Sequence, residues 1–387
     1  MPFKNADSGA VDEESVVAFP RAPVKPGFNY NRSDQGNADY FVDLFGDRIR
    51  YDHNRNRWLV WHRHRWQEDR KGVVREAAQR AAHRQLKEAR QMPSGSTDQN
   101  GKADAAALAK GEAIRWALKS QSRASRESTL STVKDRAPIS MHSVLDGWDA
   151  DPWLLGVPNG VVDLLTGELR GGQRDTDKIT LNTRVPFDPT ARCPRWERFL
   201  EEISVGDPEL VAYFRRACGY MLTGDVREDC WFAPTGEGQN GKTTFLTAWF
   251  DILGDYAFAA PFSLVQQGES KRFHTAYLQH KRFVVLSEVS KGAVIDDAML
   301  KLLTGKDAIP AEWKHGDSFE FHPSHKLWFM FNNKPTVKDT THGFWRRARI
   351  IPFSRRFDGA VDDKGLKDTL RAEYPGIFAW AVRACLE

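Results

Sequence analysis

The sequence predicts an α/β fold, in which a C-terminal domain with a central parallel sheet follows a mixed α+β domain and a helical collar. Three observations support this prediction. Apolar runs of strand length, 282–289, 326–332 and 347–353, alternate with helical or hairpin segments. A glycine-rich turn at 236–243 lies between another apolar run and a helical stretch. With 387 residues, 41% of them hydrophobic, the chain is long enough for two or three domains.

The N-terminal part is predicted to contain a tail, a hairpin and two helices. Residues 1–30 show little periodicity and are expected to form a flexible tail. Residues 48–66 alternate apolar and polar side chains around the turn-forming DHNRN, which predicts a β-hairpin. Residues 73–91 are rich in Ala, Arg and Glu and predict a helix. A second helix is expected from an N-cap at Asp104 to about Ala124.

The middle of the chain is predicted to return to short strands and then to form the collar. Asn159-Gly160 and Thr166-Gly167 are expected to be turns between strands. Asp207 is a good N-cap, and the apolar stripe that follows it predicts a helix. The predicted divisions are a tail at 1–30, an N-terminal accessory domain at 31–195, a collar at 196–228 and the C-terminal domain at 229–387.

Charge and cysteine content narrow the class of protein. A net charge of +4 on 44.0 kDa is mild, so attraction to nucleic acid would depend on local clusters. One cluster runs from Arg48 to Arg90, with thirteen Lys/Arg against five Asp/Glu, although a solvated hairpin and helix face explains it equally well. The four cysteines have no CxxC spacing, which argues against a zinc site or a disulfide framework. Without an apolar run of about eighteen residues or a signal sequence, we expect a soluble, cytoplasmic protein without membrane contact.

The glycine-rich turn matches the phosphate-binding pattern GxxxxGKT. Its glycines let the backbone N–H groups point inward at a β-phosphate, and the following helix presents its positive end to the same anion. Lys242 would neutralise β- and γ-phosphate oxygens, and the Thr243 hydroxyl would bind Mg²⁺. An ordinary turn is the less favoured interpretation. The predicted nucleotide-binding residues are Gly236, Gly238, Asn240, Gly241, Lys242, Thr243 and Thr244.

Polar residues next to the later strands narrow the kind of phosphate-loop protein. Glu288 ends one apolar run, where a carboxylate would orient the water that attacks the γ-phosphate. Asn332 ends the next, and its amide would bind the same water or phosphate. Arg346 and Arg347 precede the last strand, from which a guanidinium would reach the γ-phosphate of a neighbouring subunit. Each residue alone has an ordinary surface explanation, and the prediction rests on their order. A GTPase is disfavoured because NNKP lacks the aspartate of NKxD.

The order of these motifs resembles that of superfamily 3 helicases, in particular phage and plasmid primase-helicases related to the poxvirus primase/nucleoside triphosphatase. The likeness rests on GEGQNGKTT with its Asn240, on RFVVLSE, on LKLLTGKDAIPAEWKHGDSFEFHPSHKLWFMFNNKP and on GFWRRARIIPF. Upstream, GNADYFVDLFGDRIRY and NGVVDLLTGELR resemble the domain that precedes this helicase type. The resemblance covers most of the chain after about residue 35.

The resemblance implies an AAA+-like ATPase that assembles into a homo-oligomeric ring, usually a hexamer, with ATP and Mg²⁺ between subunits. By this resemblance, Lys242 and Thr243 would be the Walker A residues, and Glu288 would be the Walker B acid, acting on Mg²⁺ through bound water. Asn332 would be the sensor residue. Arg346 or Arg347 would be the arginine finger that reaches the ATP of a neighbouring subunit. Ser287 stands where many phosphate-loop ATPases have an Asp, so Glu288 would act alone. No primase candidate is present, so we expect a separate primase wherever priming is needed. Whether the chain ends naturally after the helicase motifs stays open.

The segment 308–321 would form a hairpin that enters the central channel of the ring. Lys314 and His315 lie at or near its tip, where a cation would contact the backbone of single-stranded or forked DNA. A solvated hairpin tip is the alternative.

The predicted function is an ATP-dependent DNA helicase or translocase in phage, prophage or plasmid replication. The alternative is a replication initiator or loader that binds DNA and uses ATP as an assembly switch without processive unwinding. The basic region 48–90 fits both. A small-molecule phosphotransferase is disfavoured because it would leave Arg346, Arg347 and Lys314 without a role.

Overall fold

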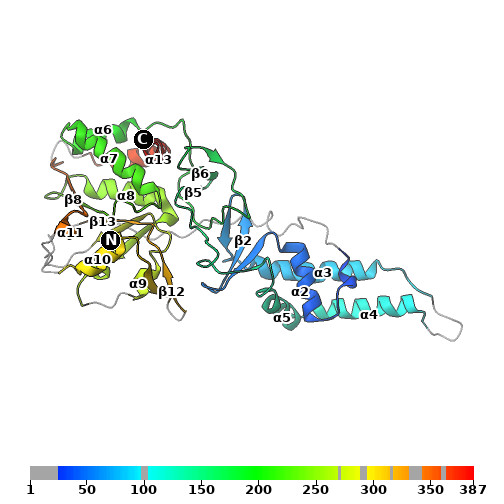
Figure 1. Cartoon of the computed structure of the whole chain (residues 1–387). Coiled ribbons are helices and arrows are strands. Elements are labelled where there is room, and N and C mark those ends of the chain that lie inside the picture. The colour runs from blue at the N-terminus through cyan, green and yellow to red at the C-terminus, as the bar shows by residue number, and fades with distance from the viewer. Residues whose placement is uncertain are drawn as a thin grey trace. The chain divides into compact units, whose positions relative to one another are not determined.

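The computed structural model describes residues 25–96, 103–268, 272–287, 294–313, 317–330, 342–358 and 363–387. Within these ranges the chain forms two compact units (Figure 1). One contains residues 25–62 and Trp66–Asp146, and the other contains Arg63–Arg65 and Gly147–Glu387. Residues 147–195, which we assigned to the N-terminal domain from the sequence, pack within the second unit.

The smaller unit combines helices with a four-stranded sheet in the order β3-β2-β1-β4. The hairpin predicted at 48–66 is confirmed, because β1 and β2 pair antiparallel from Ile49↔Val60 to Asp52↔Arg57. The elements of this unit are η1 Gly27–Asn29, α2 Asp34–Phe45, β1 Ile49–Asp52, β2 Arg57–His62, β3 Arg65–Glu68, α3 Val73–Arg90, α4 Ala105–Ser120, α5 Arg123–Val133 and β4 Ser140–Met141.

The helices of the smaller unit largely follow the sequence pattern. Helix α3 agrees with the prediction to within one residue and buries an alanine-rich face. Asp104 caps α4 as predicted, with its carboxylate accepting the Ala107 N–H at 2.8 Å. The second helix ends at Ser120 and not near Ala124, because Ser122 caps a new helix, α5, by accepting the Ser125 N–H.

The larger unit is built on a five-stranded parallel sheet in the order β14-β8-β13-β10-β9, which confirms the predicted α/β fold. Its elements are β5 Leu154–Val157, β6 Gly160–Asp163, β7 Leu169–Arg170, α6 Pro194–Ile203, α7 Pro208–Leu222, β8 Trp231–Thr235, α8 Lys242–Leu253, η2 Gly254–Tyr256, β9 Ala257–Pro261, η3 Phe262–Val265, α9 Arg272–Ala276, β10 Phe283–Ser287, α10 Asp297–Thr304, β11 Ile309–Glu312, β12 Ser318–Phe321, β13 Lys326–Phe329, α11 His342–Trp345, β14 Ala348–Pro352, α12 Leu366–Ala372 and α13 Tyr374–Cys385.

Alternate residues of the sheet strands enter two separate apolar cores, as expected for a sheet covered on both faces. Phe232 and Trp328 belong to the core shared with α6, α7, α8 and α13, and their rings stack at 4.4 Å. Trp231 and Phe329 belong to the core shared with α10 and the β11–β12 hairpin. Figure 1 shows α6, α7 and α8 on one side of the sheet and α10 on the other. In the described part of the chain, no helix combines the length and apolar character needed to cross a bilayer.

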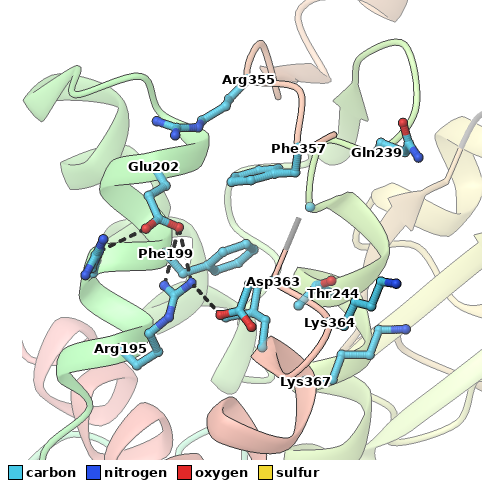
Figure 2. A pocket seen from close by; sticks show the side chains of 13 residues that line it. Arg195, Phe199, Glu202, Gln239, Thr244, Arg355, Phe357, Asp363, Lys364 and Lys367 are labelled. Atoms are coloured by element: carbon cyan, nitrogen blue, oxygen red, sulfur yellow. Dashed lines mark hydrogen bonds and ion pairs between the residues drawn. The ribbon is translucent and has the colours of Figure 1, made fainter. Parts of the chain in front are cut away.

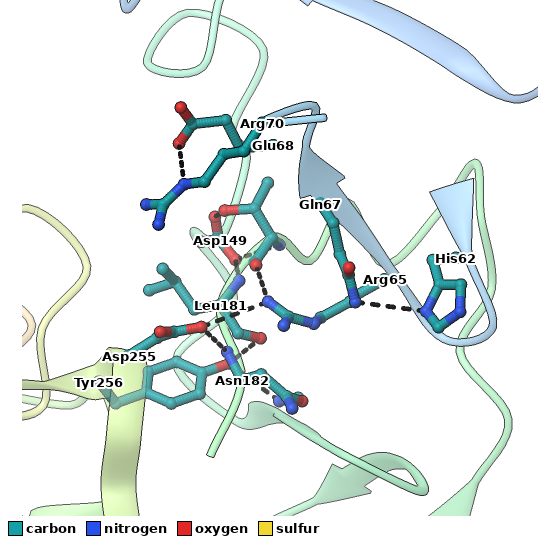
Figure 3. Close-up of polar contacts among 12 residues, drawn as sticks. His62, Arg65, Gln67, Glu68, Arg70, Asp149, Leu181, Asn182, Asp255 and Tyr256 are labelled. Carbon is teal, nitrogen blue, oxygen red and sulfur yellow. Dashed lines mark hydrogen bonds and ion pairs between the residues drawn. The ribbon is translucent and has the colours of Figure 1, made fainter. Parts of the chain in front are cut away.

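Short strands precede this sheet in the larger unit. Strands β5, β6 and β7 form an antiparallel sheet, and the first turn is centred on Pro158-Asn159 because Gly160 already pairs with Val157. The segment after β7 is fixed by polar contacts, many of them drawn in Figure 3. The Arg65 guanidinium donates to the Thr180 carbonyl oxygen at 2.8 Å and to Asp255 at 3.2 Å.

The amino edge of the parallel sheet is closed by buried cations. Arg282, just before β10, donates to the carbonyl oxygens of Asp151 and Pro152 at 2.9 and 3.0 Å. Lys326, the first residue of β13, donates to the Thr223 carbonyl oxygen, and burial lowers its pKa well below the usual range. The Pro152 carbonyl oxygen also accepts the Gly224 N–H at 2.8 Å. Arg282 and Lys326 therefore have a structural role at this edge of the sheet.

One histidine at this edge should make stability depend on pH. Burial, and next the charge of Lys326, lower the pKa of His325 from 6.5 to about 3. Between these values the unfolded chain binds more protons, so the stabilisation is complete above pH 6.5 and is lost as pH falls toward 3. We expect this group alone to lower the free energy of unfolding by about 2 kcal/mol between pH 6.5 and 5.

Urea unfolding at several pH values checks this prediction. His325→Gln should flatten the pH dependence between 6.5 and 5, whereas the exposed His322→Gln, three residues away, should leave it unchanged. Equal slopes for wild type and His325→Gln would contradict the prediction.

Candidate functional site

The glycine-rich turn lies between a strand and a helix, as its pattern requires. Strand β8 ends at Thr235, and α8 begins at Lys242 with Gly241 as its N-cap residue. Because β8 pairs parallel with both β13 and β14, the turn lies at the carboxyl edge of the sheet. This is the edge where open parallel sheets bind ligands.

Three glycines give the turn its shape. Gly238 and Gly241 have φ angles of +82° and +87°, in the left-handed region that favours glycine. Gly236 has a φ of +153°, and a Cβ there would collide with the Asn240 side-chain amide and the Phe353 carbonyl oxygen. The backbone therefore wraps closely in a way that other residues would prevent.

Two polar side chains of the turn are buried. The Lys242 ammonium donates to the Gly236 carbonyl oxygen at 2.6 Å, and burial lowers its pKa. The Asn240 side-chain nitrogen is buried without a hydrogen-bond partner among the described residues. A buried cation on a neutral carbonyl and a buried donor without an acceptor both fit an anionic ligand. The turn therefore fits an anionic group such as a phosphate.

The two threonines that follow Lys242 occupy different surroundings. Thr243 is exposed, and its hydroxyl lies 3.9 Å from the sulfur of Met330, the first residue after β13. The hydroxyl thus faces the carboxyl edge of the sheet, where it fits the predicted Mg²⁺ ligand. Thr244 instead lines a pocket on the α6 side of the turn.

Glu288, Asn332, Lys314 and His315 lie outside the described residues, and their roles stay predictions. The strands that lead to the first two are in place, since β10 ends at Ser287 and β13 is its parallel neighbour. For the other two, the predicted hairpin exists as the antiparallel pair β11 and β12.

The two arginines before β14 differ sharply. Arg347 is partly buried, and its guanidinium donates to the Asp229 carbonyl oxygen at 3.4 Å and the Thr304 hydroxyl at 3.3 Å. Arg346 is exposed, and its side chain forms no hydrogen bond or ion pair with the described residues. Only Arg346 has the freedom that a group reaching another subunit needs.

A pocket of about 590 Å³ adjoins the turn and was not predicted from the sequence (Figure 2). Its walls come from α6, the turn, the segment after β14 and the start of α12. Phe199, Phe357, Arg195 and Asp363 are among the lining residues. The clustering of aromatic and charged residues in PRWERF and SRRFDG was the available signal, but the sequence does not show that these stretches meet.

Comparison with known families agrees with the resemblance. Residues 38–205 match a family described as D5 N terminal like, and residues 235–347 match a family of unknown function, DUF5906.

Several relatives carry the name "Putative helicase", among them the following three. L207/L206 of Acanthamoeba polyphaga mimivirus is 27% identical over 58% of this chain, and 184R of Invertebrate iridescent virus 6 is 27% identical over 66%. The third, 121R of Invertebrate iridescent virus 3, is 31% identical over 54% of the chain. These matches agree with the resemblance to phage and viral primase-helicases that the motifs predict. This chain spans about a quarter of the length of these relatives: the matches cover 24%, 27% and 23% of their sequences, respectively.

Solved structures similar to this helicase-like chain include two of the NrS-1 C-terminal region in its apo A form. One has a TM-score of 0.41 at 13% identity and covers 52% of this chain and 49% of that one. The other has a TM-score of 0.44 at 12% identity and covers 62% and 53%. The α/β assignment rests on the sheet itself.

The glycines of the turn offer a direct test of its geometry. Gly238→Ala should cost about 1 kcal/mol from its left-handed φ alone, because a Cβ there meets nothing within 4 Å. Gly236→Ala should cost about 2 kcal/mol more, since its Cβ collides with a backbone carbonyl that cannot easily move. Urea unfolding of both variants measures the difference. Equal costs would contradict the described wrap of the turn.

Proposed function

We propose that this protein is an ATP-dependent DNA helicase or translocase that works in phage, prophage or plasmid DNA replication. The observation that carries the proposal is the glycine turn at the carboxyl edge of the sheet, with buried Lys242 at the start of α8. The relatives named as helicases support it.

Lys242 and the turn backbone would hold the phosphates, and the Thr243 hydroxyl would help to hold Mg²⁺. Bound Mg²⁺ would neutralise charge on the β- and γ-phosphate oxygens. Glu288 would orient the attacking water, and Asn332 would hydrogen-bond the water or the γ-phosphate. The strands that precede these residues in the sequence, β8, β10 and β13, belong to one parallel sheet, which supports the proposed shared site.

Arg346 supports action between subunits. It precedes β14, whereas the phosphate turn follows the neighbouring parallel strand β8, so the two lie at opposite edges of the sheet. The five-residue strand spans roughly 16 Å. A guanidinium at the amino edge is too far away to reach the turn of its own subunit, which supports the proposal that it reaches the turn of a neighbour in a ring. Arg347, held on Asp229 and Thr304, is the weaker candidate.

The hairpin β11–β12 would carry the contact with DNA through Lys314 and His315. Close to the tip, the Trp313 ring stacks on Phe319 of the opposite strand with 5.9 Å between the ring centroids, which helps to hold the two strands together. We propose single-stranded or forked DNA as the partner, a homo-oligomeric ring, a hexamer, as the active form, and a separate primase where priming is needed. Binding through cations should weaken as salt is raised.

One observation favours the alternative, a replication initiator or loader that binds DNA and uses ATP as an assembly switch without processive unwinding. Helix α3 of the smaller unit exposes basic side chains on one face, those of Arg75, His83, Lys87 and Arg90. Such a face can bind the DNA backbone without any ATP-driven movement along the DNA. Strand displacement on forked DNA separates the two functions. ATP-dependent displacement supports the helicase, and DNA binding without displacement supports the initiator.

Lys242→Ala should abolish ATP hydrolysis, because the γ-phosphate would lose its buried cation. Arg346→Ala should lower hydrolysis by about 10³-fold or more if it acts as a finger. Rings mixed from the two variants should regain activity, since some interfaces then pair an intact turn with an intact Arg346. Steady-state phosphate release measures this, with Arg356→Ala, another exposed arginine, as the control. Mixed rings without any recovery would contradict action in trans.

Lys314→Ala should leave basal ATP hydrolysis intact and remove its stimulation by single-stranded DNA. The reason is that the hairpin tip contacts the DNA backbone and not the nucleotide. Hydrolysis measured across a DNA titration checks this, with Lys306→Ala, ahead of the hairpin, as the matched control. Undiminished stimulation in Lys314→Ala would exclude the hairpin assignment.

A further inference from the structure

The pocket beside the turn is continuous with the phosphate site. Gly241 and Thr244 line it, and both belong to the phosphate motif at the start of α8. A nucleotide whose phosphates lie on Lys242 extends beyond the turn, because base and ribose make up most of its length. The pocket volume, about 590 Å³, is within the range of small-molecule sites.

One aromatic side chain, the half-buried Phe357, gives the pocket a flat apolar wall (Figure 2). Phe357 is tied to the turn, since its N–H donates to the Gln239 carbonyl oxygen at 2.7 Å. The Arg355 guanidinium lies 5.3 Å from the centroid of the Phe357 ring. Phe199, on α6, is fully buried next to Gly241 and supports the turn from below. The Phe357 ring is not needed to bind phosphate, so it suits a different part of the ligand.

The charges of the pocket suit an anionic ligand with a planar group. Arg195 forms ion pairs with Glu202 at 3.3 Å and with Asp363 at 3.5 Å. Both carboxylates that line the pocket are therefore already paired with a cation. Lys364 and Lys367 also line it, are exposed, and form no ion pair with the described residues. The pocket therefore carries an excess of cationic side chains next to its aromatic wall.

We infer that this pocket holds the purine base and ribose of the nucleotide, with Phe357 stacked on the base. The inference rests on the proposed ATP site and extends it to residues outside the phosphate motif. A purine is favoured because its two fused rings cover more of an aromatic face than a pyrimidine does. The Arg195–Glu202–Asp363 contacts hold α6 to the start of α12, and so position the wall without touching the phosphates.

Binding of ATP and of inorganic tripolyphosphate to the full chain tests this inference. Tripolyphosphate has no base, so it reports the phosphate turn alone. Phe357→Leu keeps an apolar side chain against the core and removes the ring. We expect it to raise the Kd for ATP about tenfold, in the range of one lost stacking contact, and to leave that for tripolyphosphate within about twofold.

Phe357→Trp, which retains a stacking surface, should bind ATP within about threefold of wild type. Phe28→Ala, at a half-buried Phe of the smaller unit, is the matched control and should change neither affinity. An unchanged preference for ATP over tripolyphosphate in Phe357→Leu would overturn the pocket assignment and leave the ATP site standing. Failure of wild type to bind either ligand would instead overturn the proposed function, and the pocket assignment with it.

Discussion

The parallel pairing of β8 with β13 and β14 determines where every part of the candidate site lies. It brings the carboxyl ends of strands that are far apart in the sequence to one edge, and the phosphate turn occupies that edge. The pairing is held by stacked aromatic rings, with Phe232 on Trp328 and Phe245 of α8 packed against the same indole. This packing therefore fixes the positions of the strand ends that carry the turn.

The two edges of the sheet differ in chemistry. At the amino edge, buried Arg282 and Lys326 donate to backbone carbonyl groups, and His325 is kept neutral by burial. At the carboxyl edge, Lys242 is also buried, but its partner is one carbonyl of a glycine turn. A cation with one neutral carbonyl partner can exchange it for a phosphate, whereas Lys326 cannot leave without removing a donor from the buried Thr223 carbonyl oxygen.

Local pattern predicted the turn, the strand before it and the helix after it, because glycine spacing and apolar periodicity are properties of neighbouring residues. The sequence could not separate Arg346 from Arg347, since the contacts of Arg347 with Asp229 and Thr304 come from distant segments. The same limit hid the aromatic pocket, whose walls at Phe199 and Phe357 meet only after folding. The break between α4 and α5 was missed because the capping serine at 122 competes with an otherwise helical composition.

The central claim is that the phosphate turn drives a DNA motor assembled from several copies of the chain. ATP hydrolysis with and without single-stranded DNA, with native mass spectrometry of the same sample, tests it most directly. The account predicts hydrolysis that DNA stimulates, carried by a ring of defined stoichiometry, and stimulation that falls as salt is raised. A monomer whose hydrolysis ignores DNA at every salt concentration would contradict it.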